Sequence, residues 1–108
     1  MSKKKKRIPS KSSPKTPVSN QPARCPICEP EFRDDLKHLA RTNPAAYDKV
    51  WRMIDECLEH PFTGTGKPEP LKHIGSDIWS RRITLEDRLV YRVGNAKIDF
   101  LTCRFHYS

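Results

Sequence analysis

The sequence predicts one small α+β domain, with two N-terminal helices packed on one face of a small antiparallel sheet. The length of 108 residues supports a single modest core. Apolar residues recur at spacings of three and four between residues 30 and 58, which is typical of helices. From residue 78 onward they alternate with polar residues in short runs, which is typical of strands. Helices followed by consecutive strands favour the α+β class.

The first 23 residues differ from the rest in composition. They are rich in Lys, Ser and Pro and contain no aromatic side chain. Such a segment cannot bury enough apolar surface to offset its loss of conformational entropy, so we expect a disordered extension over residues 1–23 and a folded domain over 24–108. Two interpretations stay open: an arm that binds nucleic acid or the ribosome, and a solubilising extension or misplaced start codon.

Net charge is distributed unevenly along the chain. The total is +8, and residues 1–24 contain eight basic side chains and no acidic one. Residues 25–60 contain five basic and eight acidic side chains, whereas residues 61–108 contain eight and five. The second half of the domain therefore suits an anionic substrate, while the basic isoelectric point belongs to the extension.

We expect a cytoplasmic protein without a membrane partner. No run is long and apolar enough to span a bilayer, and the basic N-terminus precedes no apolar segment of the secretory kind. The four cysteines are then expected to be reduced thiols.

Two helices are predicted, joined by a short link into an antiparallel hairpin. The first covers residues 30–41, with Pro30 in its first turn. Asn43 suits the cap of the second, Pro44 its first turn, and Pro61 marks its end. Their apolar stripes are Phe32, Leu36 and Leu39 in the first helix, and Tyr47, Val50, Trp51, Ile54, Cys57 and Leu58 in the second.

Strands are predicted over residues 78–83, 88–93 and 97–107, with a short first strand over 24–28. Side chains alternate between the two faces of a strand, so each strand divides into two sets. The apolar sets, expected to pack on the helices, are Leu89, Tyr91 and Val93, and Leu101, Cys103, Phe105 and Tyr107. The sets expected on the open face are Arg88 and Arg92, and Thr102, Arg104 and His106.

One carboxylate stands near the start of this strand region. Glu69 lies between Pro68 and Pro70, which restrict the backbone on both sides. Cleavage of RNA by its own 2′-hydroxyl needs a base for that proton, cations for the phosphorane charge and an acid for the leaving 5′-oxygen. Glu69 and the cationic face contain these residue types. The spacing alone indicates a basic face that binds or cleaves RNA.

Four motifs carry a resemblance to a known family. They are Pro61-Phe62-Thr63-Gly64-Thr65-Gly66-Lys67-Pro68-Glu69-Pro70-Leu71-Lys72, Trp79-Ser80-Arg81-Arg82-Ile83, Asp87-Arg88-Leu89-Val90-Tyr91 and Cys103-Arg104-Phe105-His106-Tyr107. Together they resemble the YoeB/Txe branch of the RelE-like toxins, which are ribosome-dependent mRNA endonucleases of bacterial toxin–antitoxin pairs. The resemblance is dense over residues 61–107, patchy over 29–60 and absent over 1–24.

The resemblance implies a microbial-RNase-like (RelE/YoeB) fold and a set of roles. Glu69 corresponds to the general base, Arg88 to the arginine that stabilises the pentacoordinate phosphate, and His106 to the general acid. Tyr107 shapes the active site. Supporting contacts to the RNA are implied for Lys72, Arg82 and Arg104. The chemistry is metal-independent, so we expect no cofactor.

The resemblance also implies partners. They are mRNA in the ribosomal A site, a cognate YefM/Axe-like antitoxin, and operator DNA bound through the antitoxin complex. The alternative is a non-catalytic protein of the same fold that binds RNA, the ribosome or an antitoxin. A third hypothesis, a small zinc-binding nucleic-acid module, rests on two cysteines alone.

This chain departs from the family pattern in two places. Ser108 follows the tyrosine at which the family commonly ends, and Cys25-Pro26-Ile27-Cys28 replaces a run that is usually apolar. Pro26 would confine that strand to an edge of the sheet. Cys25 and Cys28 admit three interpretations: structural thiols, a zinc site whose second ligand pair is missing at standard spacing, and a redox pair.

Overall fold

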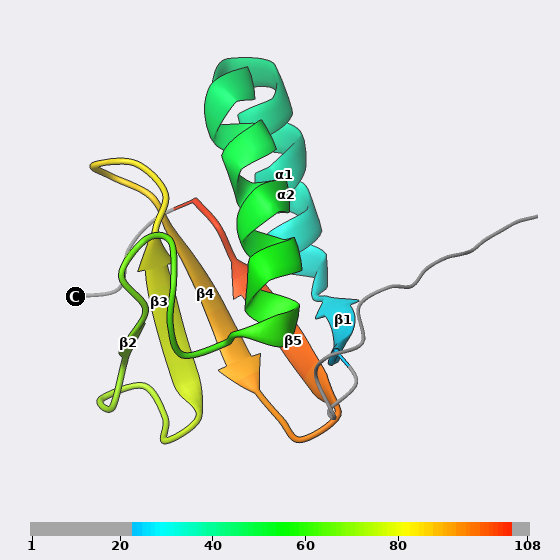
Figure 1. Ribbon diagram of the computed structural model, residues 1–108. Coiled ribbons are helices and arrows are strands. Elements are labelled where there is room, and N and C mark those ends of the chain that lie inside the picture. Colours follow the sequence, from blue (N-terminus) through cyan, green and yellow to red (C-terminus); the bar gives the residue numbers. More distant parts are fainter. Residues whose placement is uncertain (1–22, 105–108) are drawn as a thin grey trace, which may run out of the picture.

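The computed structural model describes residues 23–104 and has two helices on one face of a five-stranded sheet (Figure 1). Strand order across the sheet is β1-β5-β4-β3-β2. The elements are β1 (Cys25–Cys28), α1 (Pro30–Thr42), α2 (Pro44–Glu59), β2 (Glu69–Pro70), β3 (Ile78–Arg82), β4 (Arg88–Val93) and β5 (Lys97–Thr102). The predicted α+β class is confirmed.

The sheet differs from the prediction in three respects. It is mixed, because β1 lies parallel to β5 at one edge, while the pairs β2–β3, β3–β4 and β4–β5 are antiparallel. The two-residue strand β2 was not predicted and forms the other edge. Strand β5 ends at Thr102, and residues 103 and 104 are not in a strand although the prediction ran to residue 107; residues 105–107 lie outside the described residues. Pro26 lies in an edge strand, as its missing N–H requires.

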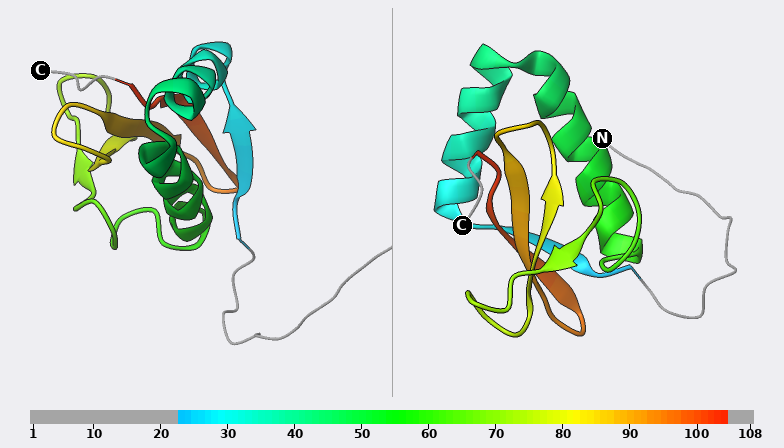
Figure 2. Two further views of the ribbon diagram at one scale, coloured as in Figure 1. Left: turned by 90° about the horizontal axis from the view of Figure 1, so that it is seen from above. Right: turned by 90° about the vertical axis from the view of Figure 1, so that its left-hand side faces the viewer.

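The helices begin and end close to the predicted residues, because polar caps and prolines define their ends. The Asn43 side chain accepts a hydrogen bond from the Ala46 N–H at 3.2 Å, and Pro44 occupies the first turn of α2. Both helices cover the same face of the sheet (Figures 1 and 2). The buried apolar residues of each helix belong to the core between the helices and the sheet.

The main core fills the space between the helices and the sheet. Phe32 of α1 packs on Phe100 of β5 with 5.6 Å between ring centroids, and Val50, Met53 and Cys57 of α2 belong to the same cluster. A smaller cluster lies apart from it and contains Leu71, Ile78 and Val90, with Leu101 against it. Leu71 follows β2, so this second cluster packs the segment that carries Glu69 against the sheet.

A β-bulge in β5 corrects the prediction for Leu101. Tyr91 of β4 pairs with Phe100 and Val90 pairs with Thr102, so Leu101 is the extra residue between the two pairs. It was expected to pack toward the helices but contacts the second cluster instead. Thr102 lies opposite Val90 as expected, and Cys103 returns to the main core as expected.

Candidate active site

The structure brings Glu69 and Arg88 together on the open face of the sheet. Pairing of β2 with β3 sets Glu69 opposite Ser80, and pairing of β3 with β4 sets Arg88 opposite Arg82. Arg88 Nη2 donates to Glu69 Oε2 at 2.8 Å, and Arg88 Nη1 donates to Ser80 Oγ at 3.2 Å. Three strands therefore supply one connected group: a carboxylate, a guanidinium and a hydroxyl.

The two charged side chains differ in exposure in a way that suits catalysis. The Glu69 side chain is 54% exposed, so a substrate hydroxyl can reach its carboxylate. The Arg88 side chain is only 16% exposed, so its guanidinium is held in place by its surroundings. Arg offers planar two-point contact to phosphate oxygens, and a partly buried cation acts on them with less screening by water. The group can therefore accept a proton and bind a phosphate at neighbouring points.

The remaining predicted cations, Arg82, Lys72 and Arg104, differ in their surroundings. Arg82 lies opposite Arg88 in the sheet. Its Nη1 donates hydrogen bonds to the carbonyl oxygens of Thr84 at 3.5 Å and Leu85 at 3.4 Å. Lys72 is exposed in the turn after β2 and makes no hydrogen bond or ion pair within residues 23–104. Arg104 follows β5 and is close enough to Asp87 to contribute to its pKa, which burial raises overall.

Two of the predicted catalytic residues, His106 and Tyr107, lie outside the described residues. The described chain ends two residues before His106, at Arg104. The backbone N–H of Cys103 is anchored by the buried Asp35 carboxylate of α1 at 3.0 Å. This bond fixes where the described chain leaves the core, three residues before His106.

Sequence reasoning missed two residues that organise this region. Ser80 accepts the second hydrogen bond of Arg88, and Arg81 is completely buried on the helix side of β3. Strand alternation would have found Arg81, because it shares a face with Trp79 and Ile83 and therefore points into the core. A buried arginine requires several partners, which is a signal of a structured polar cluster.

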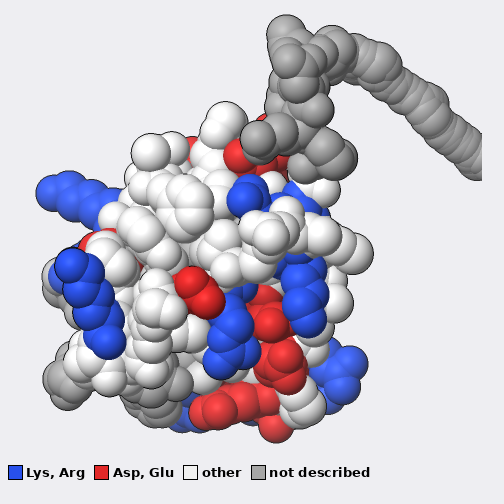
Figure 3. Space-filling view, turned by 90° about the horizontal axis from the view of Figure 1, so that it is seen from below, with Lys and Arg blue, Asp and Glu red and all other residues white. Residues whose placement is uncertain are grey.

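Charge on the surface is mixed in the view from below. Figure 3 shows Lys and Arg side chains interspersed with Asp and Glu, with no continuous basic patch on that face.

A hollow of about 250 Å³ on the helix side is lined by Lys49, Arg52, Met53, Glu56 and Thr65. It lies across β3 from the Glu69–Arg88 pair.

The four cysteines are free thiols in different surroundings. Cys25 is exposed, Cys28 is partly buried against the main core, and Cys57 and Cys103 are buried. Burial raises the pKa of the Cys28 thiol. Within residues 23–104 no group of three or more His, Cys, Asp or Glu side chains is arranged to hold a metal ion. No helix in this part of the chain is long and apolar enough to cross a membrane.

Comparison with known proteins matches this fold and these residues to one class. Residues 28–107 match the sequence model described as the YoeB-like toxin of bacterial type II toxin–antitoxin systems. The toxin YoeB of Escherichia coli K12 is 43% identical over 81 residues, which are 75% of this chain and 96% of that protein.

Solved structures agree with the sequence match. The YoeB/ParE toxin from Agrobacterium tumefaciens superimposes with a TM-score of 0.71 at 38% identity, covering 77% of this chain and 99% of that one. A YoeB–YefM complex from Staphylococcus aureus gives a TM-score of 0.68 at 30% identity, covering 78% and 98%. Fold and sequence thus define a toxin of a bacterial toxin–antitoxin system. Within that class, the chain belongs to the YoeB-like toxin family.

Proposed function

We propose that this toxin is a ribosome-dependent mRNA endonuclease that inhibits translation by cleaving mRNA in the ribosomal A site. The observation that carries the proposal is the 2.8 Å contact between Glu69 Oε2 and Arg88 Nη2 on the open face of the sheet. It joins a solvent-accessible carboxylate to a positioned guanidinium, which are two of the three groups that the reaction needs. Cleavage of translating mRNA takes place in the cytoplasm.

In the proposed reaction the 2′-oxygen of the mRNA attacks the adjacent phosphorus while Glu69 accepts the 2′-hydroxyl proton. Arg88 neutralises the charge that develops on the non-bridging oxygens of the pentacoordinate phosphate. The bond to the 5′-oxygen breaks, and His106 donates a proton to that oxygen. The products are a 2′,3′-cyclic phosphate and a 5′-hydroxyl. Tyr107 shapes the site, and Lys72, Arg82 and Arg104 contact flanking phosphates.

The contacts of Arg88 support separate roles for Ser80, Arg88 and Glu69. Ser80 holds Nη1 of Arg88, so the Arg88 guanidinium keeps its orientation when Glu69 exchanges the ion pair for the substrate hydroxyl. Within residues 23–104, Glu69 Oε1 accepts no hydrogen bond, which leaves it available to the 2′-hydroxyl. Once Glu69 Oε2 leaves the Arg88 guanidinium, Nη2 of Arg88 can donate to a phosphate oxygen in its place.

Substitution of the proposed catalytic residues tests the mechanism. Glu69→Gln, Arg88→Ala and His106→Ala are each expected to lower the single-turnover cleavage rate of ribosome-bound mRNA by about 10²–10³-fold. Arg92→Ala is the matched control for Arg88, because Arg92 lies on the same strand and face but pairs with Asp99 at 3.7 Å. It should retain the wild-type rate.

Primer extension after induced expression in a bacterial host distinguishes the proposal from the alternative function. Growth arrest with new 5′ ends inside codons, lost in His106→Ala, is the expected result. Arrest that persists in all three variants without new 5′ ends would instead identify a non-catalytic protein that occupies the ribosome.

We further propose a YefM/Axe-like antitoxin as the partner, and operator DNA as the target of the resulting complex. The support is the S. aureus structure, in which a YoeB toxin is bound to YefM. Co-expression with the protein encoded beside this toxin should restore growth and yield a co-purifying complex. A toxin that stays fully active in its presence would contradict the assignment.

A further inference from the structure

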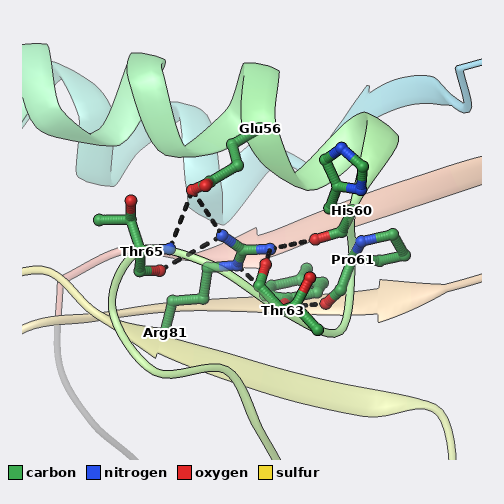
Figure 4. Close-up of polar contacts among 7 residues, drawn as sticks. Glu56, His60, Pro61, Thr63, Thr65 and Arg81 are labelled. Carbon is green, nitrogen blue, oxygen red and sulfur yellow. Dashed lines mark hydrogen bonds and ion pairs between the residues drawn. The ribbon is translucent and has the colours of Figure 1, made fainter.

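A buried arginine on β3 satisfies all of its donors. Arg81 is completely buried, and its guanidinium makes one hydrogen bond for each of its five N–H groups (Figure 4). Nε donates to the Tyr91 hydroxyl at 3.1 Å, and Nη1 donates to Glu56 Oε1 at 3.0 Å. The remaining three bonds go to the backbone carbonyls of His60, Thr63 and Thr65.

Glu56 and Tyr91 extend this cluster to the rest of the same loop. The Glu56 carboxylate also accepts from the Thr65 N–H at 3.0 Å, and the Tyr91 hydroxyl donates to the Pro61 carbonyl at 2.7 Å. Burial alone would raise the pKa of Glu56, but hydrogen bonds from Thr65 and the Arg81 charge lower it overall. Glu56, Arg81 and Tyr91, here called the loop clamp, therefore contact residues 60, 61, 63 and 65.

The clamped loop leads directly to Glu69. The Arg82 N–H binds the Gly66 carbonyl at 2.8 Å, and Gly66 has a positive φ of 84°. A Cβ at Gly66 would lie 2.8 Å from the Arg82 carbonyl oxygen, so only glycine allows this approach. Glu69 follows three residues later and lies opposite Ser80, the neighbour of Arg81 in β3.

The loop clamp and the proposed catalytic pair therefore lie on opposite faces of the sheet, and neighbouring residues of β3 contact each of them. Arg81 binds the loop on the helix side, while Ser80 binds Arg88 on the open side. Given the proposed function, we infer that Glu56, Arg81 and Tyr91 are positioning residues that hold Glu69 at the distance from Arg88 that catalysis requires. Displacement of a reacting group by about 1 Å costs on the order of 10²-fold in rate, so loosening the loop should reduce turnover.

Tyr91→Phe is the sharpest test, because it removes the hydroxyl that joins Arg81 to Pro61 and keeps the ring in the core. We expect the maximal single-turnover rate of mRNA cleavage to fall by about 10-fold or more, while the concentration of toxin at half-maximal rate changes by less than about twofold. Tyr47→Phe makes the same chemical change on α2, where the hydroxyl has no hydrogen bond within the described chain, and should cleave like wild type.

A double-mutant comparison separates positioning from general destabilisation. In the Glu69→Gln background, Tyr91→Phe should lower the residual rate by less than about twofold, because its effect is exerted through Glu69. The rates are compared at a temperature where circular dichroism shows each variant to be folded. If Tyr91→Phe does not fold, Glu56→Gln takes its place, with the exposed Glu59→Gln as its control.

The outcomes are distinguishable from failure of the proposed function. A folded Tyr91→Phe variant with wild-type turnover would overturn the inference, and so would an equal loss of rate with and without Glu69. Wild-type cleavage by Glu69→Gln itself would instead overturn the proposed role of Glu69.

Discussion

The ion pair between Glu69 and Arg88 contributes little to the stability of the fold. Glu69 is more than half exposed, and ion pairs in contact with water typically contribute about 0–1 kcal/mol. Arg81, by contrast, is buried, and each of its N–H groups donates a hydrogen bond. Removal of one partner would leave an unsatisfied donor in the core. The two arginines should therefore differ in their effect on stability: loss of Arg88 should change it little, whereas loss of Arg81 should lower it.

The four thiols should differ in reactivity according to their burial. Burial raises the pKa of Cys57 to about 11, and burial together with Asp35 and Asp87 raises the pKa of Cys103. Both thiols stay protonated at neutral pH, and the thiolate is the reactive form. We expect brief treatment of the native protein with iodoacetamide to alkylate Cys25 first, and Cys57 and Cys103 only after unfolding.

Peptide mapping by mass spectrometry measures this order, and Cys25→Ser should remove the fast phase. Rapid alkylation of Cys57 in the folded protein would contradict the packing of α2. The two cysteines of the first strand differ in their surroundings: Cys25 is exposed, whereas Cys28 packs on the core.

The start of α2 depends on one side chain. Asn43 ends α1 and caps α2 through the bond from the Ala46 N–H. Loss of an N-cap acceptor typically costs about 1 kcal/mol, so Asn43→Ala should lower the free energy of unfolding in urea by about that amount. Asn43→Ser retains an oxygen acceptor and should lose less. Equal loss in both variants would show that the cap is not the cause.

The elements with local signals were predictable from the sequence. Prolines and Asn43 define the helices to within a residue or so, and alternation defines most of β3, β4 and β5. The parallel pairing of β1 and the short strand β2 were not predictable, because both depend on partners distant in the sequence. The bulge at Leu101 reverses alternation within one strand, and no residue type near it marks the change.

The candidate site was predictable in part. Glu69 and Arg88 were identified, but the ion pair between them was not, because Lys67, Lys72 and His73 lie nearer to Glu69 in the sequence. The contact arises from sheet register, which sets Glu69 opposite Ser80 and within reach of Arg88. The loop clamp was not predicted, because its hydrogen bonds join α2, β3 and β4 to residues 60–65, and no local sequence pattern marks contacts between distant segments.

At the scale of the whole molecule, the excess basic charge and the proposed catalytic pair, Glu69 and Arg88, belong to different parts of the chain. Residues 1–22 contain seven basic and no acidic side chains, and the remaining 86 residues contain 14 basic and 13 acidic ones. The Glu69–Arg88 pair and the loop clamp lie entirely within residues 23–104. Rate and affinity for a polyanion should therefore be separable by truncation.

Removal of residues 1–22 should weaken binding to programmed ribosomes and leave the maximal cleavage rate unchanged. Each phosphate neutralised by a cation contributes about 0.7–0.9 to the slope of log affinity against log salt concentration. Loss of seven cations should therefore reduce that slope by several units. Half-maximal toxin concentrations measured from about 50 to 200 mM salt provide the test.

A full-length control with those seven residues replaced by Gln separates charge from length. If charge is the cause, the Gln variant should behave like the truncated protein, since both lose the same counterion release. A slope unchanged by either variant would show that the segment is a solubilising extension. A lower maximal rate in the truncated protein would show that residues 1–22 also influence the catalytic site, which the contacts within residues 23–104 do not require.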